Sequence, residues 1–194
     1  LRFDGFADAK TMISSAIDKG FKTIGVTNHV IVNKVLDFDR NIEPMFFNNF
    51  KDATECYKRH IDILQNLKQE FNIDIKIGFE CDFFSSLDWR NNFEKMIKEL
   101  DVDYLIGSNH FLKSTDESFL CNIYHLKKIP NRPDEETIHQ YTINHYKNII
   151  ECIKSGYFTF IAHLDYCTIF NLGVDERYDE YKHEIIETCL KKQL

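Results

Sequence analysis

The chain has 194 residues, of which 43% are hydrophobic and 14% aromatic, and its formal net charge is −7. This composition can build the core of one domain, or part of a larger one, and it excludes an intrinsically disordered protein. The acidic balance shows no basic face, so no general affinity for nucleic acid is expected, although metal ions could still let an acidic protein bind a small phosphate ester.

The cysteines and the hydropathy pattern indicate a cytoplasmic protein. No two cysteines have C-x-x-C spacing, so reduced thiols in a cytosolic protein are expected. No signal peptide and no apolar run near 18 residues is found, so no membrane partner is expected, although the chain starts at Leu1 rather than Met. The cysteines are Cys56, Cys81, Cys121, Cys152, Cys167 and Cys189.

Helical and extended patterns alternate along the chain. Amphipathic spacing of apolar residues predicts helices, and short runs rich in Ile, Val and Phe predict buried strands. Gly20 is expected to end the first helix, and Asp134 and Gly156 are the predicted caps of the fourth. The predicted helices span 7–19, 48–71, 89–100, 134–155 and 175–194, the predicted strands span 21–29, 73–80, 102–110 and 158–163, and two long loops span 30–44 and 111–133.

This alternation predicts an α/β fold with a parallel sheet and right-handed crossovers. Four strands are too few to close a barrel, and a four-stranded sheet with two open edges is a poor independent unit. Residues 1–194 are therefore expected to be one partial domain, the middle of a larger barrel.

Each predicted strand runs into a residue of a type that binds metal. These residues are His29, Glu80, His110 and His163. Because the carboxyl ends of parallel strands meet at one edge, the four side chains are expected to form one site. Imidazole and carboxylate ligands suit Zn, Fe or Mn and leave positions open for water.

Each of these residues also has a simpler interpretation. A single histidine after a strand is more often packed or solvated than a ligand, and Glu80 could pair with a lysine. Burying several such groups without partners is costly, so four in equivalent positions favour metal. No G-x-S-x-G, P-loop or G-x-G-x-x-G motif is present, which leaves metal-activated water as the expected chemistry. The remaining histidines, expected to be surface or packing residues, are His60, His125, His139, His145 and His183.

The same stretches resemble the motifs of the PHP (polymerase and histidinol phosphatase) superfamily, most closely its histidinol-phosphatase branch. Together the four motifs are specific, and they occur in the order and at the spacing of the family. They are Thr27-Asn28-His29, Gly78-Phe79-Glu80-Cys81-Asp82, Gly107-Ser108-Asn109-His110-Phe111, and Ala162-His163-Leu164-Asp165 after Gly156-Tyr157-Phe158 and before Phe170-Asn171.

The resemblance implies a distorted (β/α)7 TIM-like barrel with two or three divalent metal ions at the carboxyl ends of the strands. It implies the same four ligands and adds Asp4, counted back from Gly20. Asp82 and Asp165 could orient ligand imidazoles or, equally, cap helices and turns. Arg40 and Arg132 lie in the two long loops and could contact the phosphate or remain solvated.

The sequence departs from the family at three places. The His-x-His pair of the first strand would precede Leu1, the Asp-x-His pair of the last strand would follow Leu194, and Asn28 replaces the usual Asp. The first and last strands are therefore expected to be missing from this chain. A fragment of a full phosphatase explains this most economically, and a degenerate chain that binds metal poorly is the alternative.

The function expected from the resemblance is hydrolysis of L-histidinol phosphate to L-histidinol and phosphate in histidine biosynthesis. One alternative is a PHP phosphoesterase acting on a sugar, nucleotide or oligonucleotide phosphate. Another is a non-catalytic PHP domain, and a weaker one is a metal-dependent amidohydrolase. The sequence leaves the oligomeric state open.

Overall fold

The computed structural model describes residues 7–34, 46–129 and 131–193, and the chain divides into two compact units. The first unit contains Leu1–Cys81 and Ser86–Leu105, and the second contains Asp82–Ser85 and Ile106–Leu194. Asp4 and Arg40, both expected at the site, lie outside the described residues.

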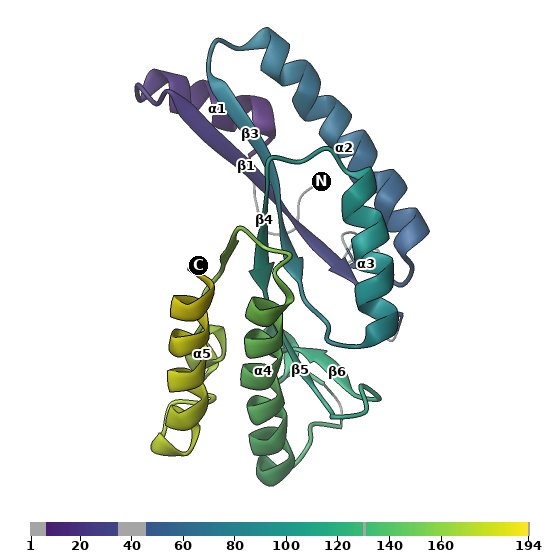
Figure 1. Cartoon of the computed structure of the whole chain (residues 1–194), viewed down its shortest axis with the longest axis vertical. Coiled ribbons are helices and arrows are strands. Elements are labelled where there is room, and N and C mark those ends of the chain that lie inside the picture. Colours follow the sequence, from purple (N-terminus) through teal and green to yellow (C-terminus); the bar gives the residue numbers. More distant parts are fainter. Residues whose placement is uncertain (1–6, 35–45, 130, 194) are drawn as a thin grey trace. The chain divides into compact units, whose positions relative to one another are not determined.

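Helices and strands alternate along the chain (Figure 1), which confirms the predicted α/β class. The helices are α1 (Ala9–Asp18), α2 (Phe50–Glu70), α3 (Leu87–Glu99), α4 (Glu135–Ser155) and α5 (Asp179–Lys192), with short 3-10 helices at Ile123–His125, Tyr166–Phe170 and Glu176–Tyr178. The strands are β1 (Thr23–Val32), β2 (Phe46–Phe47), β3 (Asp74–Asp82), β4 (Tyr104–Ser108), β5 (Phe111–Lys113), β6 (Leu120–Asn122) and β7 (Phe160–Ile161).

The predicted parallel sheet is confirmed in both units. In the first unit the strand order is β2-β1-β3 followed by the start of β4, and β1 pairs with β3 in parallel from Thr23↔Asp74 to Val30↔Cys81. In the second unit the end of β4 pairs in parallel with β7. Both β1 and β3 are exposed at alternate residues near their start and are mostly buried toward their carboxyl ends, at Val30 to Val32 of β1 and at Ile77 to Phe79 of β3.

Two strands end earlier than predicted, and two end later, one of which is β3, which continues to Asp82 beyond Glu80. β1 continues to Val32, beyond His29, whereas β4 ends at Ser108 and β7 at Ile161. β4 ends before His110 because the backbone N–H of His110 donates to the Asp82 carboxylate instead of to a neighbouring strand (2.7 Å). The predicted loop 111–133 also contains the antiparallel pair of β5 and β6, which the sequence did not indicate.

The ends of α4 follow the predicted capping residues. The Asp134 carboxylate accepts a hydrogen bond from the Thr137 backbone N–H (2.8 Å), as an N-cap does. Gly156 adopts φ of 71°, the left-handed conformation that favours glycine after a helix. Both helix boundaries are therefore decided by local sequence.

Aromatic side chains fill the core of the first unit, where α2 and α3 contact each other (Figure 1). The ring centroids of Tyr57 on α2 and Phe79 on β3 are 5.1 Å apart. Trp89 stacks on Phe93 at 4.6 Å, and its indole N–H donates to the Val32 carbonyl (2.7 Å). The indole thus adds a hydrogen bond to its apolar contacts and ties α3 to the end of β1.

Glycines on β1 and β3 make room for the Tyr104 ring. A Cβ atom on Gly78 would overlap this ring, and one on Gly25 would lie 2.6 Å from its hydroxyl oxygen. The Tyr104 hydroxyl also lies 2.6 Å from Thr27 Oγ1. On this face of the sheet, the two glycines Gly25 and Gly78 therefore leave the space that the Tyr104 ring fills.

Replacing Gly78 with Ala is expected to lower the free energy of unfolding by about 1–3 kcal/mol, because the added methyl group must displace the Tyr104 ring. The double variant with Tyr104→Leu should recover part of this loss, and Lys76→Ala at an exposed position of β3 is the control. Urea unfolding measures all three. Equal stability of Gly78→Ala and the unmodified protein would contradict the packing described.

An aliphatic and aromatic core fills the second unit, and α4 and α5 lie side by side in it (Figure 1). Its fully or almost fully buried members include Leu112 on β5, Tyr146 and Ile153 on α4, and Cys167. The Tyr146 hydroxyl donates to the Gly173 carbonyl (3.1 Å), so the polar end of this buried ring is satisfied.

All six cysteines are free thiols, and two buried ones, Cys152 and Cys167, are poor nucleophiles. Burial raises the pKa of the Cys152 thiol well above its usual value, so the thiolate is disfavoured. This agrees with the absence of a nucleophile motif in the sequence. Within residues 7–34, 46–129 and 131–193, no helix has the length and apolar character needed to cross a membrane.

Candidate metal centre

Asp82 and His110 form a buried pair in the second unit. The His110 backbone N–H donates to one carboxylate oxygen of Asp82 (2.7 Å), and its ring Nδ1–H donates to the other (2.9 Å). Asp82 is fully buried and His110 is 6% exposed. Because Nδ1 carries the proton, the lone pair of Nε2 is left for a ligand, which is how metal-binding histidines are usually held.

His163 lies beside this pair. The ring centroids of His163 and His110 are 4.7 Å apart, and a nitrogen of one lies within 4.8 Å of a nitrogen of the other. The Tyr166 ring packs against both imidazoles, at 4.7 Å from His110 and 4.9 Å from His163. The second unit therefore brings together three residues that the sequence analysis proposed for the site, which are Asp82, His110 and His163.

His29 and Glu80 lie side by side in the first unit. They are register partners in the parallel pair of β1 and β3, so their side chains point to the same face of the sheet. Both are half-buried. An imidazole and a carboxylate on adjacent strands form a mixed N/O donor pair of the kind that zinc, iron and manganese accept.

Asn28 lies on the opposite face of β1 from His29. Its amide N–H donates to Nε2 of His60 on α2 (2.6 Å), and the His60 ring packs against Phe79 at 6.0 Å. Burial lowers the pKa of His60 to about 4, so the neutral ring accepts this hydrogen bond. Asn28, which replaces the Asp usual in the family, therefore contacts α2. It does not lie on the face of β1 that carries His29.

His145 supports the chain that follows His110, a role that the sequence did not show. Its Nδ1–H donates to the Phe111 carbonyl (3.1 Å), and its own backbone carbonyl accepts from the Asn109 amide (3.2 Å). The side chain is fully buried, and burial lowers its pKa to about 4. The sequence analysis left His145 as a surface or packing residue and did not indicate which segment it would hold.

The other predicted site residues lie elsewhere. Asp165 is exposed, and its side chain makes no capping hydrogen bond at the start of the 3-10 helix that follows it. Arg132 is also exposed and pairs with Glu135 in the first turn of α4 (2.8 Å). Neither side chain is held in the arrangement around Asp82 and His110.

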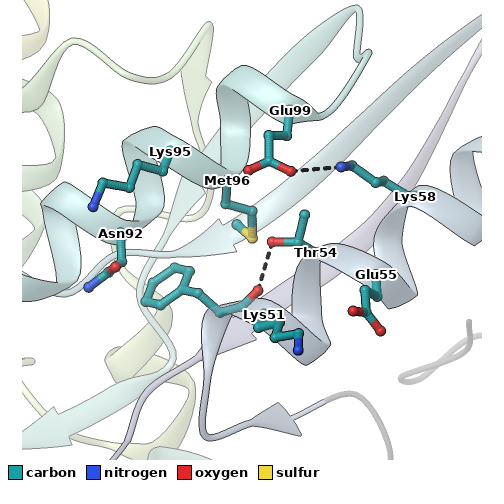
Figure 2. Close-up of a pocket in the computed structure, with 9 residues that line it drawn as sticks. Lys51, Thr54, Glu55, Lys58, Asn92, Lys95, Met96 and Glu99 are labelled. Carbon is teal, nitrogen blue, oxygen red and sulfur yellow. Dashed lines mark hydrogen bonds and ion pairs between the residues drawn. The ribbon is translucent and has the colours of Figure 1, made fainter.

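A separate groove of about 350 Å³ lies between α2 and α3 (Figure 2). Lys58 and Glu99 pair across it (2.7 Å), and the Thr54 hydroxyl donates to the Phe50 carbonyl (2.7 Å). The residues that line it include no histidine and no cysteine. Its mixed charges are partly paired, so it does not offer the donor set of a metal centre.

Comparisons with known proteins identify the family of the domain. A family model described as the PHP domain matches residues 2–192. A search of curated proteins finds no match.

Two solved structures resemble the fold at low sequence identity. One is histidinol phosphate phosphatase from Lactococcus lactis subsp. lactis Il1403, complexed with Zn, L-histidinol and phosphate (TM-score 0.62, 18% identity, 97% of this chain and 65% of that one). The other is a candidate histidinol phosphatase from Listeria monocytogenes (TM-score 0.66, 16% identity, 95% of this chain and 73% of that one). The chain thus spans slightly less than two thirds of the Lactococcus protein.

Proposed function

Because the chain belongs to the PHP domain family, we propose that it is a metal-dependent phosphoesterase acting on a small phosphate monoester. The observation that carries the proposal is the pair of Asp82 and His110. A fully buried carboxylate that holds one imidazole nitrogen leaves the other nitrogen for a cation. A histidine that only packed in the core would not need this orientation.

The proposed metal ligands are His29, Glu80, His110 and His163, as the strand pattern of the sequence predicts, with two or three Zn, Fe or Mn ions. The donor set fits these ions, because it combines imidazole nitrogens with a carboxylate and includes no thiolate. Bound divalent ions would polarise a phosphate group and acidify a water molecule.

The residues of the second unit prepare the site for a cation. Asp82 holds the orientation and the tautomer of His110 through two hydrogen bonds. Tyr166 packs against His110 and His163 and limits their rotation. His145 is neutral at physiological pH because its pKa is lowered to about 4, so it adds no positive charge that would repel a metal ion.

We propose L-histidinol phosphate as the substrate and histidine biosynthesis as the setting. The support is the fold shared with the Lactococcus protein, whose structure holds Zn, L-histidinol and phosphate. A phosphate dianion also suits an acidic protein that gains positive charge only by binding metal. Six free thiols support a reducing, cytoplasmic location.

Metal analysis and a phosphatase panel test this function on the protein encoded by its full gene. Elemental analysis should find two or three Zn, Fe or Mn ions per chain. Phosphate release should be fastest from L-histidinol phosphate in a panel with sugar and nucleotide phosphates. A protein that binds metal but prefers another ester would overturn the substrate, and one that binds no metal and hydrolyses nothing would instead be a non-catalytic PHP domain.

A further inference from the structure

The Ser108 hydroxyl is buried without a hydrogen-bond partner among the described residues. Its side chain is 2% exposed, and Oγ finds neither a donor nor an acceptor there. A buried hydroxyl left unpaired is costly, and a serine that served only for packing could be replaced by alanine. An unpaired hydroxyl next to a functional site is therefore a candidate for contact with a ligand.

The strand pattern shows which way this hydroxyl faces. A Cβ atom on Gly107 would lie 2.6 Å from Cys152 Sγ on α4 and 2.8 Å from the Phe158 ring. Phe83 packs against the same Phe158 ring at 6.2 Å. Gly107 and Phe83 therefore face α4, and their neighbours Ser108 and Asp82 face the opposite side, because successive side chains alternate.

Ser108 and Asp82 are neighbours on that side. The Phe83 backbone N–H donates to the Ser108 carbonyl (3.0 Å). This hydrogen bond places the side chains of Asp82 and Ser108 next to each other. The Asp82 carboxylate holds the His110 ring, and the His163 ring is 4.7 Å from that of His110. The unpaired hydroxyl thus faces the side on which the proposed metal ligands of the second unit lie.

We propose that Ser108 is a substrate-binding residue whose O–H donates a hydrogen bond to a phosphate oxygen of the ester. The inference rests on the proposed phosphoesterase function and adds one residue to its site. A phosphate group only accepts hydrogen bonds, and a neutral hydroxyl can donate one without repelling metal ions. The hydroxyl also gains in this way a hydrogen bond that the described residues do not provide.

Replacing Ser108 with Ala tests the proposal, because it should lower kcat/KM without lowering Tm. The kcat/KM for the phosphate ester should fall about tenfold to a hundredfold, and the inhibition constant of inorganic phosphate should rise, because a hydrogen bond to a charged group is lost. The Tm of the metal-free protein should stay the same or rise, because the hydroxyl removed has no partner in residues 7–34, 46–129 and 131–193. Metal content should not change.

Ser155→Ala is the matched control. The Ser155 hydroxyl donates to the Cys152 carbonyl (2.6 Å), so this variant should lower Tm and leave kcat/KM unchanged. A lower Tm for metal-free Ser108→Ala would overturn the proposal, because it would show that the hydroxyl already has a stabilising partner, such as an internal water molecule. An unchanged kcat/KM in Ser108→Ala would overturn the proposal while the phosphoesterase function stands. If the unmodified protein hydrolyses no phosphate ester, the proposed function itself fails.

Discussion

The Asp82→Asn variant is expected to bind Zn²⁺ about ten to a hundred times more weakly than the unmodified protein and to lose most phosphoesterase activity. The carboxylate accepts both the backbone N–H and the ring Nδ1–H of His110. The amide N–H of asparagine would instead donate to Nδ1, which moves the ring proton to Nε2. His110 would then have no lone pair at the nitrogen that is left for metal.

Competition with a chelating dye measures this Zn²⁺ affinity, and the phosphate ester assay measures the activity. Asp88→Asn is the matched control, because Asp88 is exposed on α3 and its ion pair with Lys34 is exposed as well. The control should bind Zn²⁺ as the unmodified protein does. Unchanged Zn²⁺ affinity in Asp82→Asn would show that this carboxylate does not set the tautomer of a metal ligand.

The metal-free protein is expected to lose about 4 kcal/mol of its free energy of unfolding between pH 7 and pH 5, or about 2 kcal/mol for each of two buried histidines. His60 is 7% exposed and His145 is fully buried, and burial lowers the pKa of each from 6.5 to about 4. Between these values the unfolded chain binds a proton at each histidine that the folded protein does not. Stability is therefore complete above pH 6.5 and falls as the pH approaches 4.

Urea unfolding between pH 7 and pH 5 measures this loss, with a chelator present because metal binding depends on pH as well. The His145→Gln variant should show about half the slope, whereas His183→Gln at an exposed position of α5 should match the unmodified protein. A pH-independent free energy of unfolding over this range would contradict the neutral, buried state of both histidines.

The local sequence was enough to predict the main helices and the parallel strands, and it identified the candidate metal ligands. The caps of α4 could be read directly, because Asp134 and Gly156 act on peptide groups within a few residues of themselves. The short runs rich in Ile, Val and Phe predicted the parallel strands, because these residue types favour extended, buried segments. The histidines and the glutamate near the strand ends could be chosen because all of them follow the same pattern.

The tertiary structure alone decided which of these residues support one another. Asp82 and His110 are separated by 28 residues in the chain, and their pairing ends β4 before the histidine that the sequence placed on the strand. The contact of Asn28 with His60 and the unpaired hydroxyl of Ser108 also depend on which face of a strand each side chain occupies. Capping and apolar periodicity act over short distances along the chain, and so they can be predicted from it. Partners across strands are selected by packing and register, which bring together segments that the linear sequence keeps apart.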